Sequence, residues 1–158
     1  MKRILLSLLV LIGLISCCNS NEKCTSHHTN VIPQPLSLVQ GKGCFTVDTN
    51  TVIVSDSEVE NIADYLRTYI PLKGNNAIEN NNISLAVDKN LGAEEYSLSI
   101  SENGIKICGG TYGGVFNGVQ TLLQLLPHEV YSKSAKLPMN VPYVEIKDKP
   151  QYDYRGLL

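Results

Sequence analysis

The sequence predicts a small domain that mixes α-helices and β-strands, and three observations support this fold class. Apolar residues alternate with serines over residues 96–101, which is the two-residue period of a half-buried strand. Apolar residues recur with helical spacing over residues 112–126, and again over residues 59–70. A hairpin followed by an amphipathic helix that packs on its apolar face is expected to form the nucleus of the domain.

The strand at residues 96–101 is expected to be one half of a β-hairpin. Asn103-Gly104 predicts the turn, because both central residues of a type I′ turn require positive φ. A two-residue loop at these positions would place Ile100 opposite Ile107. The apolar residues of both strands would then share one face of the sheet.

The helix expected after the hairpin has the strongest apolar stripe in the chain, and Pro127 ends it. The stripe consists of Tyr112, Val115, Phe116, Val119, Leu122, Leu123 and Leu126. Burial of these side chains would contribute roughly 10–20 kcal/mol before conformational entropy is subtracted. The other side of the helix is expected to present Asn117, Gln120, Thr121 and Gln124.

A second helix is expected to start near Ser57, because Ser57 and Glu60 have the spacing of a capping box. Its apolar stripe consists of Val59, Ile62, Ala63, Leu66, Tyr69 and Ile70. The acidic residues of its first turns fit the positive end of the helix dipole. We therefore interpret them as a solvated helix start rather than as a catalytic carboxylate pair.

Further strands are expected at residues 45–48, 51–54, 83–87 and 141–146. Pro142 lacks the N–H group that a central strand donates, so the last strand is expected at an edge or to begin at the proline. The glycines of residues 109–114 do not have the spacing of a phosphate-binding loop. Close backbone packing at a strand-to-helix corner is the interpretation that we favour.

The N-terminus resembles the signal of a bacterial lipoprotein. Lys2-Arg3 precedes a short apolar run, and Leu14–Cys17 is similar to a lipobox, in which Cys17 is lipidated after cleavage. An uncleaved core helix and an ordinary secretory signal are the alternatives. In the lipoprotein interpretation, residues 1–16 are a signal peptide and residues 17–30 are a lipidated polar tether. Because residue 18 is not Asp, the outer membrane is the expected location, with the domain facing the periplasm or the cell surface.

Four cysteines besides Cys17 allow three disulfide pairings, and the sequence does not choose among them. They are Cys18, Cys24, Cys44 and Cys108. Cys44 and Cys108 fall in predicted strands, where we favour small buried thiols over a disulfide. Cys24, His27 and His28 lie in the polar tether without a second pair of ligands, so no metal or other cofactor is expected. The net charge of −2 gives no electrostatic reason to expect nucleic acid as a partner.

The helix motif and its flanks resemble a known family. Residues 109–127, GGTYGGVFNGVQTLLQLLP, are similar to the last helix of the N-terminal domain of bacterial β-N-acetylhexosaminidases, glycoside hydrolase family 20. Asn117 differs from the tyrosine expected there. Residues 33–45 resemble the opening strand of that domain, and residues 148–156 resemble its passage into a catalytic barrel.

This resemblance implies a sheet of about five strands with two helices on one face, at residues 31–147, followed by the start of a (β/α)8 barrel at residues 148–158. In the family, an adjacent Asp-Glu pair further along performs catalysis: the Glu protonates the leaving oxygen and the Asp orients the acetamido group of the substrate. These 158 residues contain no Asp-Glu dipeptide. We therefore expect no catalytic residue in this chain and no activity from it alone.

The resemblance also implies one substrate-binding residue. Arg155 matches an arginine that grips sugar hydroxyls at the end of the first barrel strand, and a guanidinium presents several fixed donors to neighbouring oxygens. The expected partners of the full enzyme are glycans with terminal N-acetylhexosamine. The alternative is a stand-alone, lipid-anchored module that binds a partner or a sugar.

Overall fold

The computed structural model describes residues 29–72, 81–132 and 134–152. Its main elements in chain order are β1 (Ser37–Val47), β2 (Val52–Ser55), α2 (Glu60–Arg67), β3 (Asn82–Val87), β4 (Tyr96–Ser101), β5 (Gly104–Gly109), α3 (Tyr112–Leu125) and β6 (Met139–Asp148). Two short 3-10 turns, η2 (Ser57–Val59) and η3 (His128–Val130), precede α2 and follow α3.

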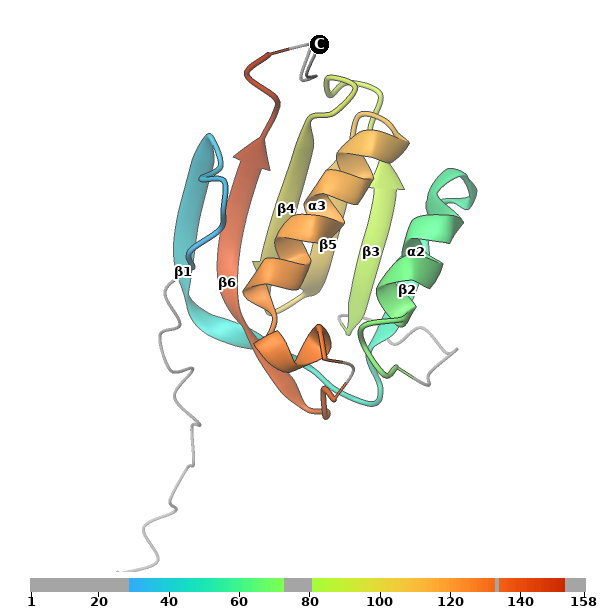
Figure 1. Cartoon of the computed structure of the whole chain (residues 1–158), viewed down its shortest axis with the longest axis vertical. Coiled ribbons are helices and arrows are strands. Elements are labelled where there is room, and N and C mark those ends of the chain that lie inside the picture. Colours follow the sequence, from blue (N-terminus) through green and yellow to red (C-terminus); the bar gives the residue numbers. More distant parts are fainter. Residues whose placement is uncertain (1–28, 73–80, 133, 153–158) are drawn as a thin grey trace, which may run out of the picture.

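The strands form one mixed sheet in the order β1-β6-β4-β5-β3-β2. The β2–β3 and β3–β5 pairs are parallel, and the other pairs are antiparallel. Both helices lie on the same face of the sheet (Figure 1). This confirms the predicted fold class. The sheet has six strands rather than about five, and the opening strand β1 pairs along β6 for much of its length.

The position of β6 corrects the prediction made from Pro142. The strand lies inside the sheet, between β1 and β4, and it begins before the proline. Its pairing with β4 reaches only to Val144, so Pro142 has a strand partner on the β1 side alone, opposite Cys44. The register of β1 shifts between Gln40 and Cys44 at this point. A proline is tolerated at such a bulge because the ladder is already interrupted there.

The hairpin of β4 and β5 forms, but its register differs from the prediction. Ile100 lies opposite Ile105 rather than Ile107, so Gly104 belongs to β5 and the loop comes one residue earlier. Gly104 has φ +117, and a Cβ there would be 2.6 Å from the carbonyl oxygen of Asn82 on β3. The turn is therefore shaped partly by the neighbouring strand. The apolar residues still share one face, because the register moved by an even number of residues.

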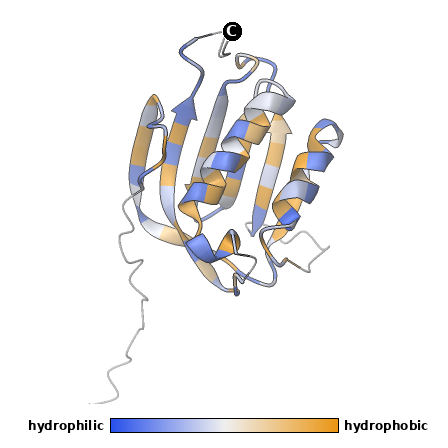
Figure 2. Cartoon of the chain, in the orientation of Figure 1, coloured by the Kyte–Doolittle hydropathy of each residue, from blue (hydrophilic) through white to orange (hydrophobic). Residues whose placement is uncertain are grey.

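The core lies between the sheet and the helices. The strand residues that face the helices are buried, and hydrophobic and hydrophilic residues alternate along the strands (Figure 2). The α3 stripe is buried except at Tyr112, which is 50% exposed, and at Phe116, which is half-buried. Thr121, expected on the polar side, is buried against β4, where its hydroxyl lies 2.7 Å from that of Tyr96.

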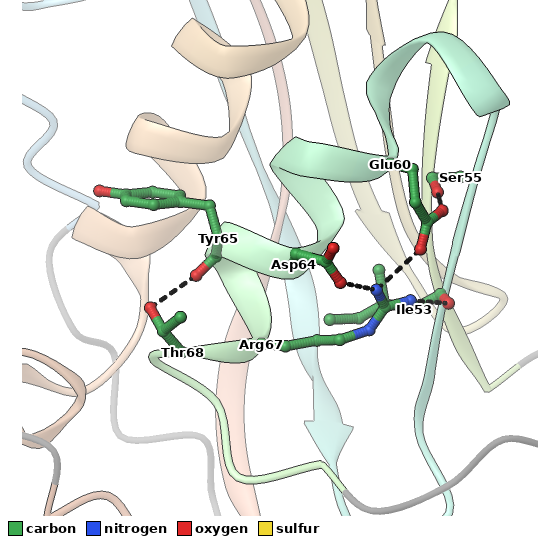
Figure 3. A network of polar contacts seen from close by, with 7 residues as sticks. All are labelled: Ile53, Ser55, Glu60, Asp64, Tyr65, Arg67 and Thr68. Carbon is green, nitrogen blue, oxygen red and sulfur yellow. Dashed lines mark hydrogen bonds and ion pairs between the residues drawn. The ribbon is translucent and has the colours of Figure 1, made fainter.

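The start of α2 also differs from the prediction. Ser57 does not form a capping box with Glu60, because residues 57–59 form the turn η2 and Glu60 is the first residue of α2. Glu60 instead accepts hydrogen bonds from Ser55 and Arg67 (Figure 3). The apolar stripe of this helix is confirmed as buried, with Tyr69 only half-buried.

The glycines between β5 and α3 pack as expected. A Cβ on Gly109 would be 2.1 Å from the nitrogen of Val115, and one on Gly110 would be 1.9 Å from the carbonyl oxygen of Gly92. Thr111 caps α3, because its hydroxyl accepts a hydrogen bond from the N–H of Gly113. The strand can therefore turn directly into the helix.

Cys44 and Cys108 lie in strands β1 and β5 as predicted, and both are free and half-buried. Burial raises the pKa of the Cys108 thiol. Cys18 and Cys24 lie outside the described residues. No helix in the described part of the chain is long and apolar enough to cross a membrane.

Candidate functional site

The two functional residues predicted from the sequence, Cys17 and Arg155, lie outside the described residues. The same holds for Cys24, His27 and His28 of the tether. The site can therefore be built only from the described surface of the domain. Within the described ranges, no group of three or more His, Cys, Asp or Glu side chains is placed to hold a metal ion.

A hollow of about 440 Å³ lies beside α3, where the opening segment and the exit segment of the domain meet. The opening segment, residues 31–36, forms one wall, and the exit segment, residues 148–152, forms another. Asn117, Gln120 and Gln124 of α3 line the third side. We call this hollow the amide groove, because side-chain amides dominate its helix wall.

Hydrogen bonds hold the opening segment in this place. The Gln124 side-chain oxygen accepts from the N–H of Ile32 at 2.9 Å, and the Asp148 carboxylate accepts from the N–H of Leu36 at 3.1 Å. Val31 is buried in the core, so the segment is anchored at its start as well. The groove is thus bounded by α3 and by the opening segment, which lies far from α3 in the sequence.

The helix wall of the groove is polar but uncharged. Asn117 donates from its amide to the carbonyl of Glu94 at 3.3 Å, and Gln120 donates to the hydroxyl of Tyr65 at 3.3 Å. Beneath them lies the Tyr96–Thr121 hydroxyl pair. Burial raises the pKa of Tyr96, so its hydroxyl stays neutral at physiological pH. This wall can offer hydrogen bonds but no charge.

An aromatic cluster adjoins the groove through Gln120. Its rings are Tyr65 of α2, Tyr69 just after α2, Phe116 of α3 and Tyr131 just after η3. Neighbouring centroids lie 5.1 Å apart for Tyr65–Tyr69, 5.4 Å for Tyr65–Phe116 and 6.1 Å for Tyr69–Tyr131, distances at which aromatic rings attract one another. Tyr131 is 54% exposed.

Two tyrosine hydroxyls of this cluster, those of Tyr69 and Tyr131, have a raised pKa. The hydroxyls of Tyr65 and Tyr69 lie 3.0 Å apart, and this hydrogen bond raises the pKa of Tyr69. Burial raises the pKa of Tyr131. The cluster therefore offers aromatic rings and hydroxyls as contact groups.

The charges of α2 are collected on its other side. Arg67 pairs with Glu60 at 2.9 Å and with Asp64 at 2.7 Å, and it also donates to the carbonyl of Ile53 on β2 at 3.4 Å. Figure 3 shows Tyr65 pointing away from this charged group. The charged side chains of α2 and the aromatic ring of Tyr65 thus lie on different sides of the helix.

The arrangement suits contact rather than proton transfer. The helix wall of the groove and the cluster present amides, hydroxyls and rings, whereas Glu94, Asp148 and Lys149 line other sides of the groove. The raised pKa values among these groups belong to Tyr69, Tyr96 and Tyr131. Sequence reasoning identified Asn117, Gln120 and Gln124 as an outward polar side but not as the wall of a groove. It missed the aromatic cluster, because the four rings come from three segments that are far apart in the sequence. One signal was available: α3 contains no charged residue.

The fold is that of a small α+β domain, a mixed six-stranded sheet with two helices. Residues 28–149 match the family model described as glycosyl hydrolase family 20, domain 2. The chain belongs to this family and corresponds to an N-terminal domain of its members, which confirms the resemblance.

Known proteins of this family resemble the chain over most of its length. A β-hexosaminidase of Porphyromonas gingivalis is 39% identical over 141 residues, covering 82% of this chain and 18% of that protein. The solved β-N-acetylhexosaminidase of Streptomyces coelicolor superposes with a TM-score of 0.69 at 32% identity, covering 79% of this chain and 27% of that one. An exo β-N-acetylglucosaminidase of Vibrio harveyi, solved with N-acetylglucosamine, has a TM-score of 0.65 at 26% identity, covering 80% and 20%.

The relatives are much longer than the part they share with this chain. The chain spans 14–18% of the length of the curated β-hexosaminidases of Porphyromonas gingivalis, Vibrio vulnificus and Entamoeba histolytica.

Proposed function

We propose that this chain is the non-catalytic N-terminal domain of an exo-acting β-N-acetylhexosaminidase. The enzyme would remove terminal N-acetylhexosamine from glycans by the substrate-assisted, retaining mechanism of its family. The observation that carries this proposal is the match of residues 28–149 to one domain of a glycosidase family, in relatives that are named β-hexosaminidases. The absence of an Asp-Glu dipeptide in the sequence supports a domain that does not catalyse by itself.

A stand-alone binding module is the second candidate. The amide groove favours it, because amides and hydroxyls are groups that also bind sugars and peptides. The two candidates differ in what the chain needs in order to act. The enzyme domain requires a catalytic barrel, whereas the module would bind a ligand without one.

The test compares the chain alone with a chimera. The chimera joins residues 28–158 of this chain to the part of the Porphyromonas gingivalis enzyme that follows its matching segment. We expect the chain alone neither to hydrolyse a chromogenic N-acetylglucosaminide nor to bind N-acetylglucosamine by calorimetry, and we expect the chimera to hydrolyse it. Turnover by the chain alone would contradict the proposal, and so would a folded chimera without activity.

Arg155 is proposed to contact the sugar in the complete enzyme. In the chimera, Arg155→Ala should lower kcat/KM by a factor of about 100 or more, because a charged or polar substrate group would lose its hydrogen-bond partner. Lys147→Ala is the matched control, since Lys147 is an exposed cation on β6. Unchanged activity in Arg155→Ala would show that this arginine does not bind substrate.

Lipid anchoring at Cys17 is a separate proposal, supported by the basic start, the apolar run and the Leu14–Cys17 motif. In a Gram-negative host, Cys17→Ala should abolish labelling with a fatty-acid analogue and leave the precursor uncleaved. Cys18→Ala, one position further on, should still be labelled. Equal labelling of the two variants would refute the lipoprotein assignment and, with it, the proposed outer-membrane location.

A further inference from the structure

We propose that Cys44 of β1 forms a disulfide with Cys24 of the polar tether after the chain has left the cytosol. This modification closes the loop between residues 24 and 44 and fastens the tether to the edge of the sheet. The inference goes beyond the proposed enzyme assignment. It takes from the lipid-anchoring proposal only that the chain is exported to an oxidising compartment. It also replaces the interpretation of Cys44 as an unpaired thiol.

The tether enters the described domain close to Cys44. Thr29, the first described residue, donates from its hydroxyl to the side-chain oxygen of Gln40 on β1 at 3.4 Å, and Figure 1 shows the described chain starting beside this strand. Thr29 also lines a hollow of about 350 Å³ together with Pro142. Pro142 is the residue of β6 that lies opposite Cys44. Thr29 is therefore near the part of β1 that contains Cys44.

The tether is long enough for Cys24 to reach this thiol. The partners of Gln40 and Cys44 on β6 are only two residues apart, so Gln40 and Cys44 are separated by about 7 Å along the sheet. Cys24 precedes Thr29 by five residues, a stretch that spans up to about 17 Å. A disulfide requires the two Cα atoms to lie within about 7 Å of each other. Five residues can meet this requirement without being fully extended.

Cys44 occupies an accessible position in the sheet. β1 is an edge strand, so one of its sides has no neighbouring strand, and its register shifts between Gln40 and Cys44. Pro142, opposite Cys44, has no N–H to donate to the ladder. Cys44 is half-buried and has no disulfide partner among the described residues. The backbone of an edge strand beside a bulge can adjust to the geometry of a disulfide more easily than a central strand can.

The sheet excludes Cys108 as the partner of Cys44. The two residues lie on β5 and β1, and both β4 and β6 lie between these strands. Three strand spacings correspond to about 14 Å, twice the limit for a disulfide. The partner of Cys44 must therefore come from the tether.

Cys24 suits this role better than Cys18. Cys18 directly follows Cys17, the proposed site of lipidation, so a link to Cys18 would pull β1 against the membrane. A link to Cys24 leaves residues 18–23 between the lipid and the domain. The loop closed by Cys24 is also shorter, which lowers the entropic cost of closing it by a small amount.

Formation of the disulfide is a two-electron oxidation. An S–S bond forms between the Sγ atoms of Cys24 and Cys44, and both thiols lose their protons. The two electrons reduce the disulfide of an oxidant, either a thiol–disulfide exchange protein or glutathione disulfide, to two thiols. Compartments outside the cytosol supply oxidants of this class.

The disulfide shortens the tether. Without it, the domain is held from Thr29, 12 residues after Cys17, at a distance of up to about 40 Å. With it, the domain is held from Cys24, seven residues after Cys17, at a distance of up to about 25 Å. The proposed lipid anchor would then hold the domain by the edge that β1 forms.

Peptide mapping tests the proposal, because trypsin places the cysteines of interest in separate peptides. Cleavage after lysine and arginine gives residues 17–23, 24–42, 43–67 and 107–133. The full chain is expressed with its own signal in a Gram-negative host, and its free thiols are alkylated in denaturant without reduction. Mass spectrometry should find peptide 24–42 linked to peptide 43–67, and Cys108 alkylated. An alkylated Cys44, or a link from peptide 43–67 to any other peptide, would overturn the proposal.

Cys24→Ser and Cys18→Ser are matched variants within the tether. Cys24→Ser should increase the alkylated fraction of Cys44 at least tenfold, whereas Cys18→Ser should leave it at the wild-type level. Reduction should lower the urea midpoint of the wild type and of Cys18→Ser but not of Cys24→Ser, because the disulfide restricts the unfolded chain. An equal effect of reduction on the wild type and Cys24→Ser would refute the link. Should Cys24→Ser not accumulate, the peptide map of the wild type decides.

Cell fractionation separates this inference from the proposed function. An exported chain with an alkylated Cys44 would reject the disulfide and leave the enzyme assignment and the lipid anchor intact. A chain recovered only from the cytosol would contradict the lipid anchor instead. The purified full chain is then oxidised with glutathione disulfide and mapped in the same way. A link between peptides 24–42 and 43–67 would support the proposal in that sample, and its absence would reject it.

Discussion

The glycines that join β5 to α3 provide the sharpest test of the structure, and Gly110→Ala is the most informative change. The added Cβ would lie 1.9 Å from the carbonyl oxygen of Gly92, whereas ordinary contact begins near 3.4 Å. The atoms would therefore have to separate by about 1.5 Å. Both belong to the backbone, so no side-chain rotation can relieve the clash.

The expected loss of stability follows from the backbone groups that Gly110→Ala would displace. Gly110 donates from its N–H to the carbonyl of Glu95 at 3.0 Å, and Glu95 donates to the carbonyl of Gly92 at 3.0 Å. Overpacking costs about 1–3 kcal/mol, and each hydrogen bond lost adds about 1 kcal/mol. Gly110→Ala should therefore lower the free energy of unfolding by about 3–5 kcal/mol, a large share of the roughly 5–15 kcal/mol that holds a domain together.

Gly113→Ala is the matched control within the same glycine motif. A Cβ at Gly113 would lie 3.7 Å from the hydroxyl oxygen of Thr111, which is ordinary contact. Gly113 is also the second residue of α3, and alanine favours a helix over glycine by up to about 1 kcal/mol. This variant should be as stable as the wild type or slightly more stable.

Urea unfolding followed by circular dichroism measures both variants under the same conditions. A free energy of unfolding for Gly110→Ala within about 0.5 kcal/mol of the wild type, or an equal loss in both variants, would contradict the predicted clash. Either result would show that the close approach to Gly92 does not explain the glycine at position 110.

Two further predictions concern the core and acid stability. Leu122→Ala should lower the free energy of unfolding in urea by about 2–5 kcal/mol, because Leu122 is fully buried and the truncation leaves a cavity. Gln124→Ala should lower it by at most about 1 kcal/mol, through loss of the hydrogen bond from Ile32. Equal losses would contradict the orientation of α3. Hydrogen bonds from Ser55 and Arg67 hold the pKa of Glu60 below its ordinary value of 4.5, so this stabilisation is present above pH 4.5 and is lost as the pH falls through the lowered value. The urea midpoint should thus fall between about pH 5 and pH 3 more steeply in the wild type than in Glu60→Gln, and parallel curves would show that Glu60 contributes nothing to acid stability.

Local patterns in the sequence determined which side of each element faces the core. The alternation over residues 96–101 was confirmed, and so was the stripe of α3 except at the exposed Tyr112, because strand and helix periods are set by the backbone of a single segment. The corner glycines and the motif of residues 109–127 were likewise sufficient to indicate the family. A change of register in the β4–β5 hairpin did not alter the face, since that change was an even number of residues.

The tertiary structure decided whatever depends on atoms from distant segments. Gly104 meets Asn82 of β3, which shifts the hairpin, and Pro142 sits inside the sheet because it faces the bulge in β1. The amide groove needs the opening segment beside α3, and the aromatic cluster needs α2, α3 and the residue after η3 together. No single stretch of sequence contains these contacts, because their partners become neighbours only when the sheet has brought them together.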